Sequence, residues 1–212
     1  MTLSNDARFW DRSARRYAAA AVSDPRGYER TLRRTRELLE ENDHVLELGC
    51  GTGSTALRLA DGVASYLGTD FSPATIAIAQ EKLAAAPVAA LSFLAATAED
   101  PALRAGQYDA VLAFNYLHLV RDLPGTLRRI HALLADGGLF ISKTGCLGDM
   151  NPLIRLALLP AMRAIGKAPY TGAFSASALE RQVAAAGFEI LATELHADGG
   201  SDRRPYMVAR KR

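Results

Sequence analysis

The chain has 212 residues, enough for one domain with a sizeable hydrophobic core. Hydrophobic residues make up 49% and charged residues 23%, which excludes a disordered or collagen-like chain. The 25 Lys and Arg against 23 Asp and Glu leave a formal net charge of +2, without the basic excess that nucleic-acid binding requires. Neither a signal peptide nor a transmembrane segment is recognisable, so we expect a cytoplasmic protein. The two cysteines lack the spacing of a metal site, and we expect no metal.

From residue 44 onward, short apolar runs alternate with longer amphipathic segments, as is typical of βα units and a parallel sheet. Residues 1–43 precede this alternation and are expected to form an N-terminal helical segment. The predicted strands are 44–48, 65–70, 91–95, 108–114 and 138–146, and the predicted helices are 54–60, 73–86 and 122–135.

The last part of the chain predicts one helix and two strands. Ser177 and Glu180 have the spacing of a capping box, and Gly187 suits a helix end. Strands are expected at 188–195 and 205–210, joined by a turn at residues 198–201.

Residues 148–174 interrupt the alternation. Leu153, Leu156, Leu159, Met162 and Ile165 follow helical periodicity, although Pro160 must kink or split such a helix. One interpretation is an insertion that acts as a lid over a hydrophobic acceptor; the other is ordinary packing on the core.

A glycine-rich loop follows the first predicted strand. Gly49, Gly51 and Gly53 remove Cβ atoms where the backbone must turn tightly and where a ligand can approach it. Asp70 ends the next strand, where a carboxylate can accept hydrogen bonds from a ribose. Both a dinucleotide and S-adenosylmethionine (SAM) carry such a ribose. Glu47 favours SAM, because a carboxylate beside the loop repels a pyrophosphate and attracts an ammonium or sulfonium group.

The sequence resembles class I SAM-dependent methyltransferases, especially the small quinone-biosynthesis (type 11-like) members. Residues 47–53 (ELGCGTG) and 68–73 (GTDFSP) resemble the first two motifs of that family. Residues 107–114 (QYDAVLAF) resemble its fourth strand, and 134–141 (LADGGLFI) the turn before its fifth. The resemblance implies a single domain over residues 1–212. Its fold would be a Rossmann-like, doubly wound α/β fold with a seven-stranded sheet, the last strand antiparallel, and helices on both faces.

The resemblance also implies a SAM site, with S-adenosylhomocysteine as product. The glycine loop, including Cys50, would contact the methionine part, with Glu47 near its amino group. Asp70 would bind the ribose and Phe71 would lie near the adenine. The position that is often Asp after the third strand is Thr97 here, followed by Ala98, so that a hydroxyl or the backbone would recognise the adenine. The remaining expected cofactor contacts are Asn115 and Tyr17.

Several of these residues also have a structural interpretation. In that interpretation the glycines serve packing alone, and Tyr17 simply covers the core. Thr97 and Ala98 are then ordinary loop residues, and Asn115 caps a helix.

His118 is the candidate catalytic base, because it follows the fourth strand near the expected methyl group. Its alternative role is packing beneath the next helix. The preferred function is methyl transfer to a small, hydrophobic acceptor by in-line displacement. A non-catalytic SAM-binding protein is one alternative. An NAD(P)-dependent oxidoreductase is the other, although the chain contains no Tyr-x-x-x-Lys pair.

Overall fold

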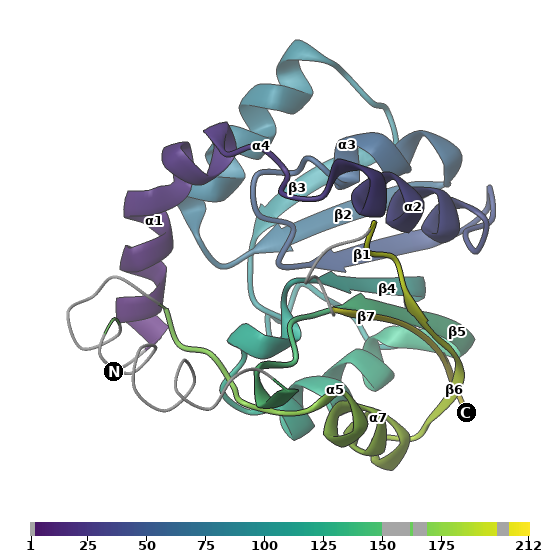
Figure 1. The fold of residues 1–212 in the computed structure, drawn as a ribbon. Helices are drawn as coiled ribbons and strands as arrows, with labels where there is room; N and C mark the ends of the chain where they lie inside the picture. Colours follow the sequence, from purple (N-terminus) through teal and green to yellow (C-terminus); the bar gives the residue numbers. More distant parts are fainter. Residues whose placement is uncertain (1–2, 150–161, 163–168, 199–203) are drawn as a thin grey trace.

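The computed structural model describes residues 3–149, 162, 169–198 and 204–212 (Figure 1). Seven strands form one sheet in the order β3-β2-β1-β4-β5-β7-β6. β7 is antiparallel to both of its neighbours, and the other pairs are parallel. The expected fold class is therefore confirmed. The strands are β1 (His44–Leu48), β2 (Ser65–Asp70), β3 (Leu91–Ala95), β4 (Tyr108–Phe114), β5 (Leu134–Lys143), β6 (Phe188–Leu195) and β7 (Pro205–Lys211).

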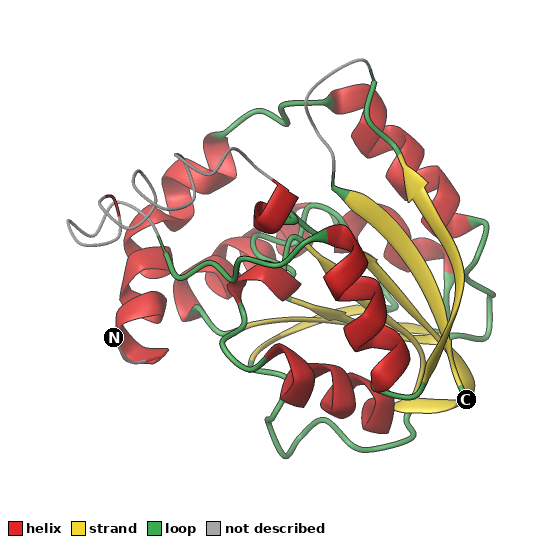
Figure 2. Ribbon diagram, turned by 60° about the horizontal axis from the view of Figure 1, so that its bottom comes forward, coloured by secondary structure: helices red, strands yellow, loops and turns green. Residues whose placement is uncertain are grey.

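Helices cover both faces of the sheet, with α2 and α3 on one side and α5 and α7 on the other (Figures 1 and 2). The helices are α1 (Leu3–Ala19), α2 (Pro25–Arg36), α3 (Ala56–Leu59), α4 (Pro73–Ala85), α5 (Leu123–Leu133) and α7 (Ala176–Ala185). Short 3-10 turns form η1 (Ala60–Gly62), η2 (Leu117–Leu119) and η3 (Leu147–Asp149). None of the helices in the described part of the chain is long and apolar enough to cross a membrane.

Alternating side chains of the central strands fill two cores. On β1, Val45 packs with Leu32 of α2 on one face, whereas Leu46 and Leu48 face the α5 side. These buried strands end at one edge of the sheet, where the loops after β1 and β4 begin. In open α/β sheets, ligands bind outside this carboxyl edge of the strands.

Several predicted boundaries differ from those of the structure. The helix expected at 54–60 is split into α3 and η1. The helix expected to begin at Ser177 begins at Ala176, because Ser175 Oγ accepts a hydrogen bond from Ala178 N at 3.1 Å and caps it. Glu180 accepts a hydrogen bond from Thr193 instead of completing a capping box.

The strand expected at 138–146 begins at Leu134 and ends at Lys143. Tyr108 pairs with Leu134 and Ala110 with Leu139, so the extra residues form an irregularity inside the strand. Gly137, at a φ of +77°, permits it. The Asp-Gly-Gly sequence that indicated a turn before the strand is therefore part of the strand itself.

Most of the 148–174 segment, and with it the expected lid, lies outside the described residues, as does most of the 198–201 turn. Backbone hydrogen bonds hold the two described ends of the segment in place. Gly148 N donates to Phe174 O at 2.8 Å, and Gly172 N donates to His118 O at 2.7 Å. The segment therefore leaves and rejoins the fold next to η2.

Candidate functional site

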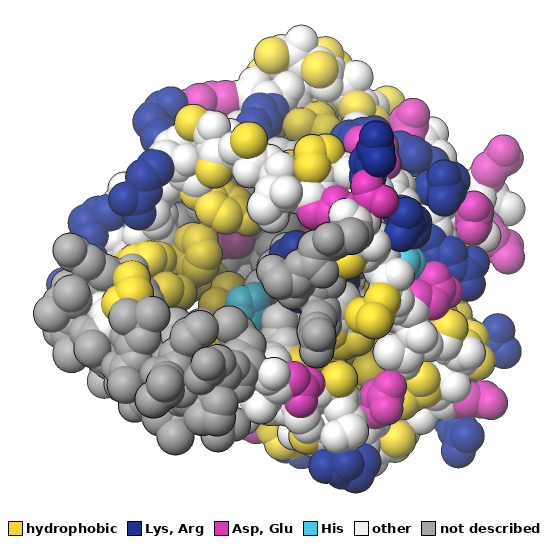
Figure 3. Space-filling view, viewed as in Figure 1, with side chains coloured by type: hydrophobic (Ala, Val, Ile, Leu, Met, Phe, Trp, Pro, Cys, Tyr) yellow, Lys and Arg dark blue, Asp and Glu magenta, His cyan; other side chains and the backbone are white. Residues whose placement is uncertain are grey.

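A pocket of about 280 Å³ opens at the carboxyl edge of the sheet. Its walls come from the end of α1 and residues 20–24, α2, the glycine loop, and the ends of β4 and β5. The surface is hollowed beside α1 in the space-filling view (Figure 3). Six of the twelve predicted site residues line the pocket, namely Tyr17, Glu47, Gly49, Cys50, Gly51 and Asn115. The others, Gly53, Asp70, Phe71, Thr97, Ala98 and His118, do not line this pocket.

All three loop glycines have a positive φ, but two of them are also needed for packing. A Cβ on Gly49 would lie 2.6 Å from the Tyr116 ring, and a Cβ on Gly53 would lie 2.6 Å from the Phe93 ring. Close packing against an aromatic ring therefore explains in part why Gly49 and Gly53 must be glycine. It does not explain why residue 51 is glycine.

Gly51 combines a φ of +54° with an open approach to its backbone. The nearest atom to a Cβ at this position is Tyr17 Cε1, at 3.6 Å. Gly51 N donates to Asp70 Oδ2 at 3.1 Å, which fixes the loop against the end of β2. The backbone on either side of Gly51 is thus held in place while its surface lines the pocket.

Asp70 connects the glycine loop to α4. Besides Gly51, its carboxylate accepts hydrogen bonds from Ser72 N at 2.9 Å and Thr75 Oγ1 at 3.1 Å. Burial raises the pKa of Asp70 above its ordinary value, although these hydrogen bonds oppose the shift. The half-buried Phe71 follows directly in the chain. Asp70 therefore positions the loop in this structure, whatever else it binds.

Glu47 places a carboxylate in the pocket wall at the end of β1. Its side chain is 2% exposed, and Tyr66 OH donates to Glu47 Oε2 at 2.8 Å. Burial raises the pKa of Glu47 to about 7, and the negative charge of Asp70 adds to the shift. A cationic ligand group in the pocket would stabilise the ionised form.

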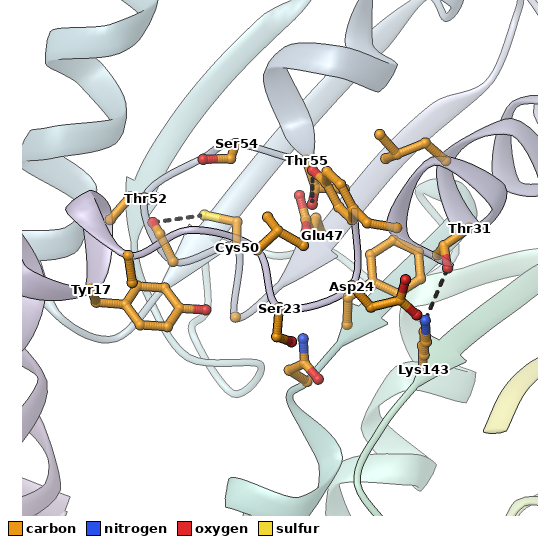
Figure 4. Close-up of a pocket in the computed structure, with 18 of the residues that line it drawn as sticks. Tyr17, Ser23, Asp24, Thr31, Glu47, Cys50, Thr52, Ser54, Thr55 and Lys143 are labelled. Atoms are coloured by element: carbon orange, nitrogen blue, oxygen red, sulfur yellow. Dashed lines mark hydrogen bonds between the residues drawn. The ribbon is translucent and has the colours of Figure 1, made fainter. Parts of the chain in front are cut away.

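Tyr17 lies at one end of the pocket, opposite Lys143 (Figure 4). It is 50% exposed, and its ring makes an edge contact with Trp10 at a centroid distance of 5.8 Å. The helix that carries it, α1, is attached to α4 through Ser72 Oγ, which donates to Asp11 at 2.6 Å. In this structure Tyr17 forms a wall of the pocket and is only half covered.

Thr97 and Ala98 follow β3 in a loop that Arg129 of α5 holds in place. Thr97 is exposed and Ala98 is buried. The Arg129 guanidinium donates to Ala98 O at 2.9 Å, Leu103 O at 2.7 Å and Asp100 O at 3.4 Å. This role of Arg129 was not predictable from the sequence, because no local pattern links α5 to the loop after β3.

Asn115 follows β4 with a φ of +53° and does not cap η2, whose N-cap is Tyr116. Its Oδ1 accepts a hydrogen bond from Arg204 Nη1 at 2.7 Å. His118 Nδ1 lies 2.9 Å from Thr144 Oγ1. Burial, together with the charge of Arg204, lowers the pKa of His118 to about 4, so its ring is neutral at pH 7.

Sequence reasoning missed the polar residues of the pocket that come from outside the glycine loop. These are Ser23, Asp24, Thr31, Lys143 and Arg204. Lys143 directly follows the largely apolar run at residues 139–142, and a charged residue at that place in the sequence was a usable signal. The others are brought to the pocket only by the tertiary fold.

Residues 46–140 match the family described as a methyltransferase domain. The chain is 35% identical over 105 residues to Fumosorinone synthetase of Cordyceps fumosorosea, covering 46% of this chain and 2% of that protein. It is 29% identical over 107 residues to the putative methyltransferase YqeM of Bacillus subtilis, covering 49% of this chain and 42% of that protein. The chain therefore spans less than half the length of these relatives.

The fold is also similar to a crystal structure of an S-adenosylmethionine-dependent methyltransferase from Mesorhizobium loti, with a TM-score of 0.70 and 21% identity. The alignment covers 87% of this chain and 98% of that one. The structural similarity therefore extends well beyond residues 46–140.

Proposed function

We propose that the chain transfers the methyl group of SAM to a small, hydrophobic acceptor, because residues 46–140 match a methyltransferase domain and the fold is similar to that of a SAM-dependent methyltransferase. The observation that carries this proposal is the buried Glu47 carboxylate in the same pocket as the open backbone of Gly51. A negative charge there suits the ammonium and sulfonium end of SAM and disfavours a pyrophosphate.

The residues present fit the methionine part of SAM. Glu47 would accept the ammonium group, and the turn at Gly49, Cys50 and Gly51 would lie along the methionine chain, with Asn115 opposite. Tyr17 would cover the bound cofactor from α1. A Cβ at Gly51 would meet only the Tyr17 ring, at 3.6 Å, which is compatible with a ligand that approaches the backbone beside Tyr17.

The adenosyl part would lie on the other side of the glycine loop. There Asp70 would accept hydrogen bonds from the ribose, and Phe71 would lie near the adenine. Thr97 and the Ala98 backbone would bind the adenine edge. The loop of these last two residues is fixed by Arg129, which supports recognition by backbone atoms in the absence of the usual carboxylate.

Bound SAM would supply an electrophilic methyl group for in-line displacement, and the chain's own task is to align the acceptor and exclude water. His118 is the proposed base for an acceptor that must lose a proton. In the tautomer in which Nδ1 donates to Thr144 Oγ1, the lone pair of the neutral ring is on Nε2, which would accept the proton. A carbon or amine acceptor would need His118 less.

A hydrophobic acceptor is supported by the apolar part of the pocket wall, which includes Ala20, Val22 and Phe114. Two alternatives are a SAM-binding protein without catalysis and an NAD(P)-dependent oxidoreductase.

Calorimetric titration with SAM, S-adenosylhomocysteine and NADH tests the cofactor. We expect the adenosyl ligands to bind in the micromolar range and NADH not to bind. Asp70→Asn should weaken binding, while Asp61→Asn, in the exposed η1 turn, should not. Binding of NADH alone would overturn the proposal.

Turnover is tested separately with methyl-labelled SAM and a panel of hydroxyl, amine, thiol and carbon acceptors. We expect label in at least one product, with stoichiometric S-adenosylhomocysteine. Tight SAM binding without a labelled product from any acceptor class would favour the non-catalytic alternative.

A further inference from the structure

A tyrosine of the buried core reaches the carboxylate of the pocket wall. Tyr66, on β2, is 0% exposed, and its hydroxyl donates to Glu47 Oε2 at 2.8 Å. In the register of β1 and β2, Tyr66 pairs with Val45 and Gly68 pairs with Glu47. Because Gly68 has no side chain, it leaves room opposite Glu47, and the Tyr66 ring extends along the strand to the carboxylate. The strand register therefore builds this contact.

The contact between Tyr66 and Glu47 costs more to bury than an apolar pair would. Taking a carboxylate and a phenol out of water is unfavourable unless they are hydrogen-bonded, and two apolar side chains of similar size would avoid the cost. The Glu47 carboxylate is part of the pocket wall (Figure 4), whereas Tyr66 does not line this pocket. Tyr66 can therefore act on a ligand there only through Glu47.

The Tyr66 hydroxyl is a neutral donor. Burial raises the pKa of Tyr66 well above its ordinary value, and the charge of Glu47 adds to the shift, so that the phenol keeps its proton. Its hydrogen bond favours ionised Glu47 and opposes the rise that burial causes in the pKa of Glu47. A lysine or arginine in its place would also favour the carboxylate, but its positive charge would repel a cationic ligand. A neutral donor leaves the negative charge of Glu47 available to the pocket.

Ionisable side chains from several elements surround Glu47. They are Tyr66 and Asp70 of β2, Tyr17 of α1, Tyr28 of α2, Cys50 of the glycine loop, and Asp24, Lys143 and Arg204 elsewhere on the pocket wall. Burial raises the pKa of the three tyrosines and of Cys50, so these groups stay neutral up to about pH 9. The same neighbours surround Glu47 in a Tyr66→Phe variant, so that a changed titration of Glu47 reports the lost hydroxyl.

We propose that Tyr66 is a positioning residue of the cofactor site, whose hydroxyl orients the Glu47 carboxylate and keeps it negatively charged for the ammonium group of the ligand. The proposal rests on the proposed function for the identity of that ligand. The effect on the carboxylate is a property of the chain alone. Tyr66 thus controls the charge of the pocket without touching the ligand.

The Glu47 carboxylate is followed first in the ligand-free protein. Carbon-13 NMR of labelled glutamate side chains measures its titration between about pH 5 and about pH 9. The Glu47 signal is assigned by its loss in Glu47→Gln. We expect Tyr66→Phe to raise the pKa of Glu47 from about 7 to about 8, because a hydrogen bond to an ionised group is commonly worth about one pH unit or more.

Calorimetric titration with S-adenosylhomocysteine measures the consequence for binding. From the ionised fraction of Glu47, Tyr66→Phe should bind about eightfold more weakly than the wild type at about pH 6.5 and within about twofold of it at about pH 9. 5′-Methylthioadenosine, which has no ammonium group, should bind both proteins equally. In a Glu47→Gln background, Tyr66→Phe should change the affinity for neither ligand.

Tyr206→Phe is the matched control. Tyr206 is equally buried, lies on β7 in the same core, and has its hydroxyl 3.0 Å from Thr35 Oγ1. This variant should keep the Glu47 titration and the pH profile of binding of the wild type. Should Tyr66→Phe fail to fold, the wild type carries the test. Its buried Tyr66 hydroxyl proton should give a proton NMR signal that shifts as Glu47 titrates near pH 7.

Three results would overturn the proposal. The first is an unchanged pKa of Glu47 in Tyr66→Phe, and the second is a Tyr66 hydroxyl signal that does not respond to the titration of Glu47. The third is a loss of S-adenosylhomocysteine affinity by the same factor at every pH, which is the effect of a merely structural residue. If no adenosyl ligand binds the wild type, the proposed function fails, and the two NMR titrations still decide whether Tyr66 controls the charge of Glu47.

Discussion

The buried Glu47 predicts that cofactor binding depends on pH. Only the ionised carboxylate attracts an ammonium group, and burial raises the pKa of Glu47 to about 7. Binding below pH 7 must therefore expel a proton from Glu47. His118 does not complicate this range, because burial lowers its pKa to about 4.

The size of the effect follows from the fraction of ionised Glu47. Between about pH 7.5 and about pH 5.5 this fraction falls from roughly 75% to roughly 3%. The α-amino group of the ligand, with an ordinary pKa of about 8, is mostly protonated throughout. The affinity for S-adenosylhomocysteine should therefore fall about twentyfold, or about 2 kcal/mol, over this range.

Calorimetry at the two pH values measures this change in wild type and in Glu47→Gln. The variant should bind weakly at both, with no pH dependence. Glu189→Gln, on the exposed side of β6, is the control and should behave like the wild type. Equal affinity of the wild type at both pH values, or an unchanged slope in Glu47→Gln, would refute the reasoning.

The same pKa shift acts on stability without ligand. Folding raises the pKa of Glu47, so the folded state binds this proton more tightly than the unfolded state does. The resulting stabilisation of the folded state is fully present below about pH 4.5 and is lost as the pH rises through about 7. Between those limits the wild type should lose up to about 3 kcal/mol of unfolding free energy relative to Glu47→Gln. Urea denaturation at both pH values measures it.

Three further variants test the packing and chemistry of the site. Gly53→Ala should cost about 2–4 kcal/mol in urea denaturation, since strain at positive φ adds to a clash with the Phe93 ring. Gly106→Ala, with the same sign of φ and no atom within 4 Å, should cost only about 1–2 kcal/mol. Arg129→Ala should lower stability by about 2 kcal/mol and weaken adenosine binding, whereas the exposed Arg128→Ala should change neither. His118→Gln should reduce kcat about 100-fold or more for a hydroxyl acceptor while the Kd for SAM is unchanged, and equal kcat would remove it from the mechanism.

The sheet was predictable because each early strand is a short apolar run followed by a turn signal. The wrong element boundaries arose where neighbouring residues carry competing signals. Ser175 and Ser177 both suit a cap, and only Ser175 has the extended backbone of an N-cap residue. Gly137 and Gly138 indicate a turn in the sequence, but the flanking residues pair with β4.

The glycine-loop side of the site was predictable because its residues lie close together in sequence. The opposite wall was not, because Lys143 and Arg204 are brought together only by the pairing of β5 with β7. The role of Arg129 was not predictable for the same reason, because its three carbonyl partners lie 26 to 31 residues away in the sequence. Periodicity and motifs describe neighbours along the chain, whereas these contacts depend on strand order.

The position of β7 has a consequence for how the protein is made. This strand follows the other six in sequence, yet it lies inside the sheet between β5 and β6. During synthesis, which proceeds at about 5–20 residues per second, the strands up to β5 can associate while the β5 edge stays unpaired. An open edge of that kind can pair with another nascent chain. The wall that carries Lys143 and Arg204 forms only when translation has passed β7, so the pocket is completed only after strands β1 to β5 have been made.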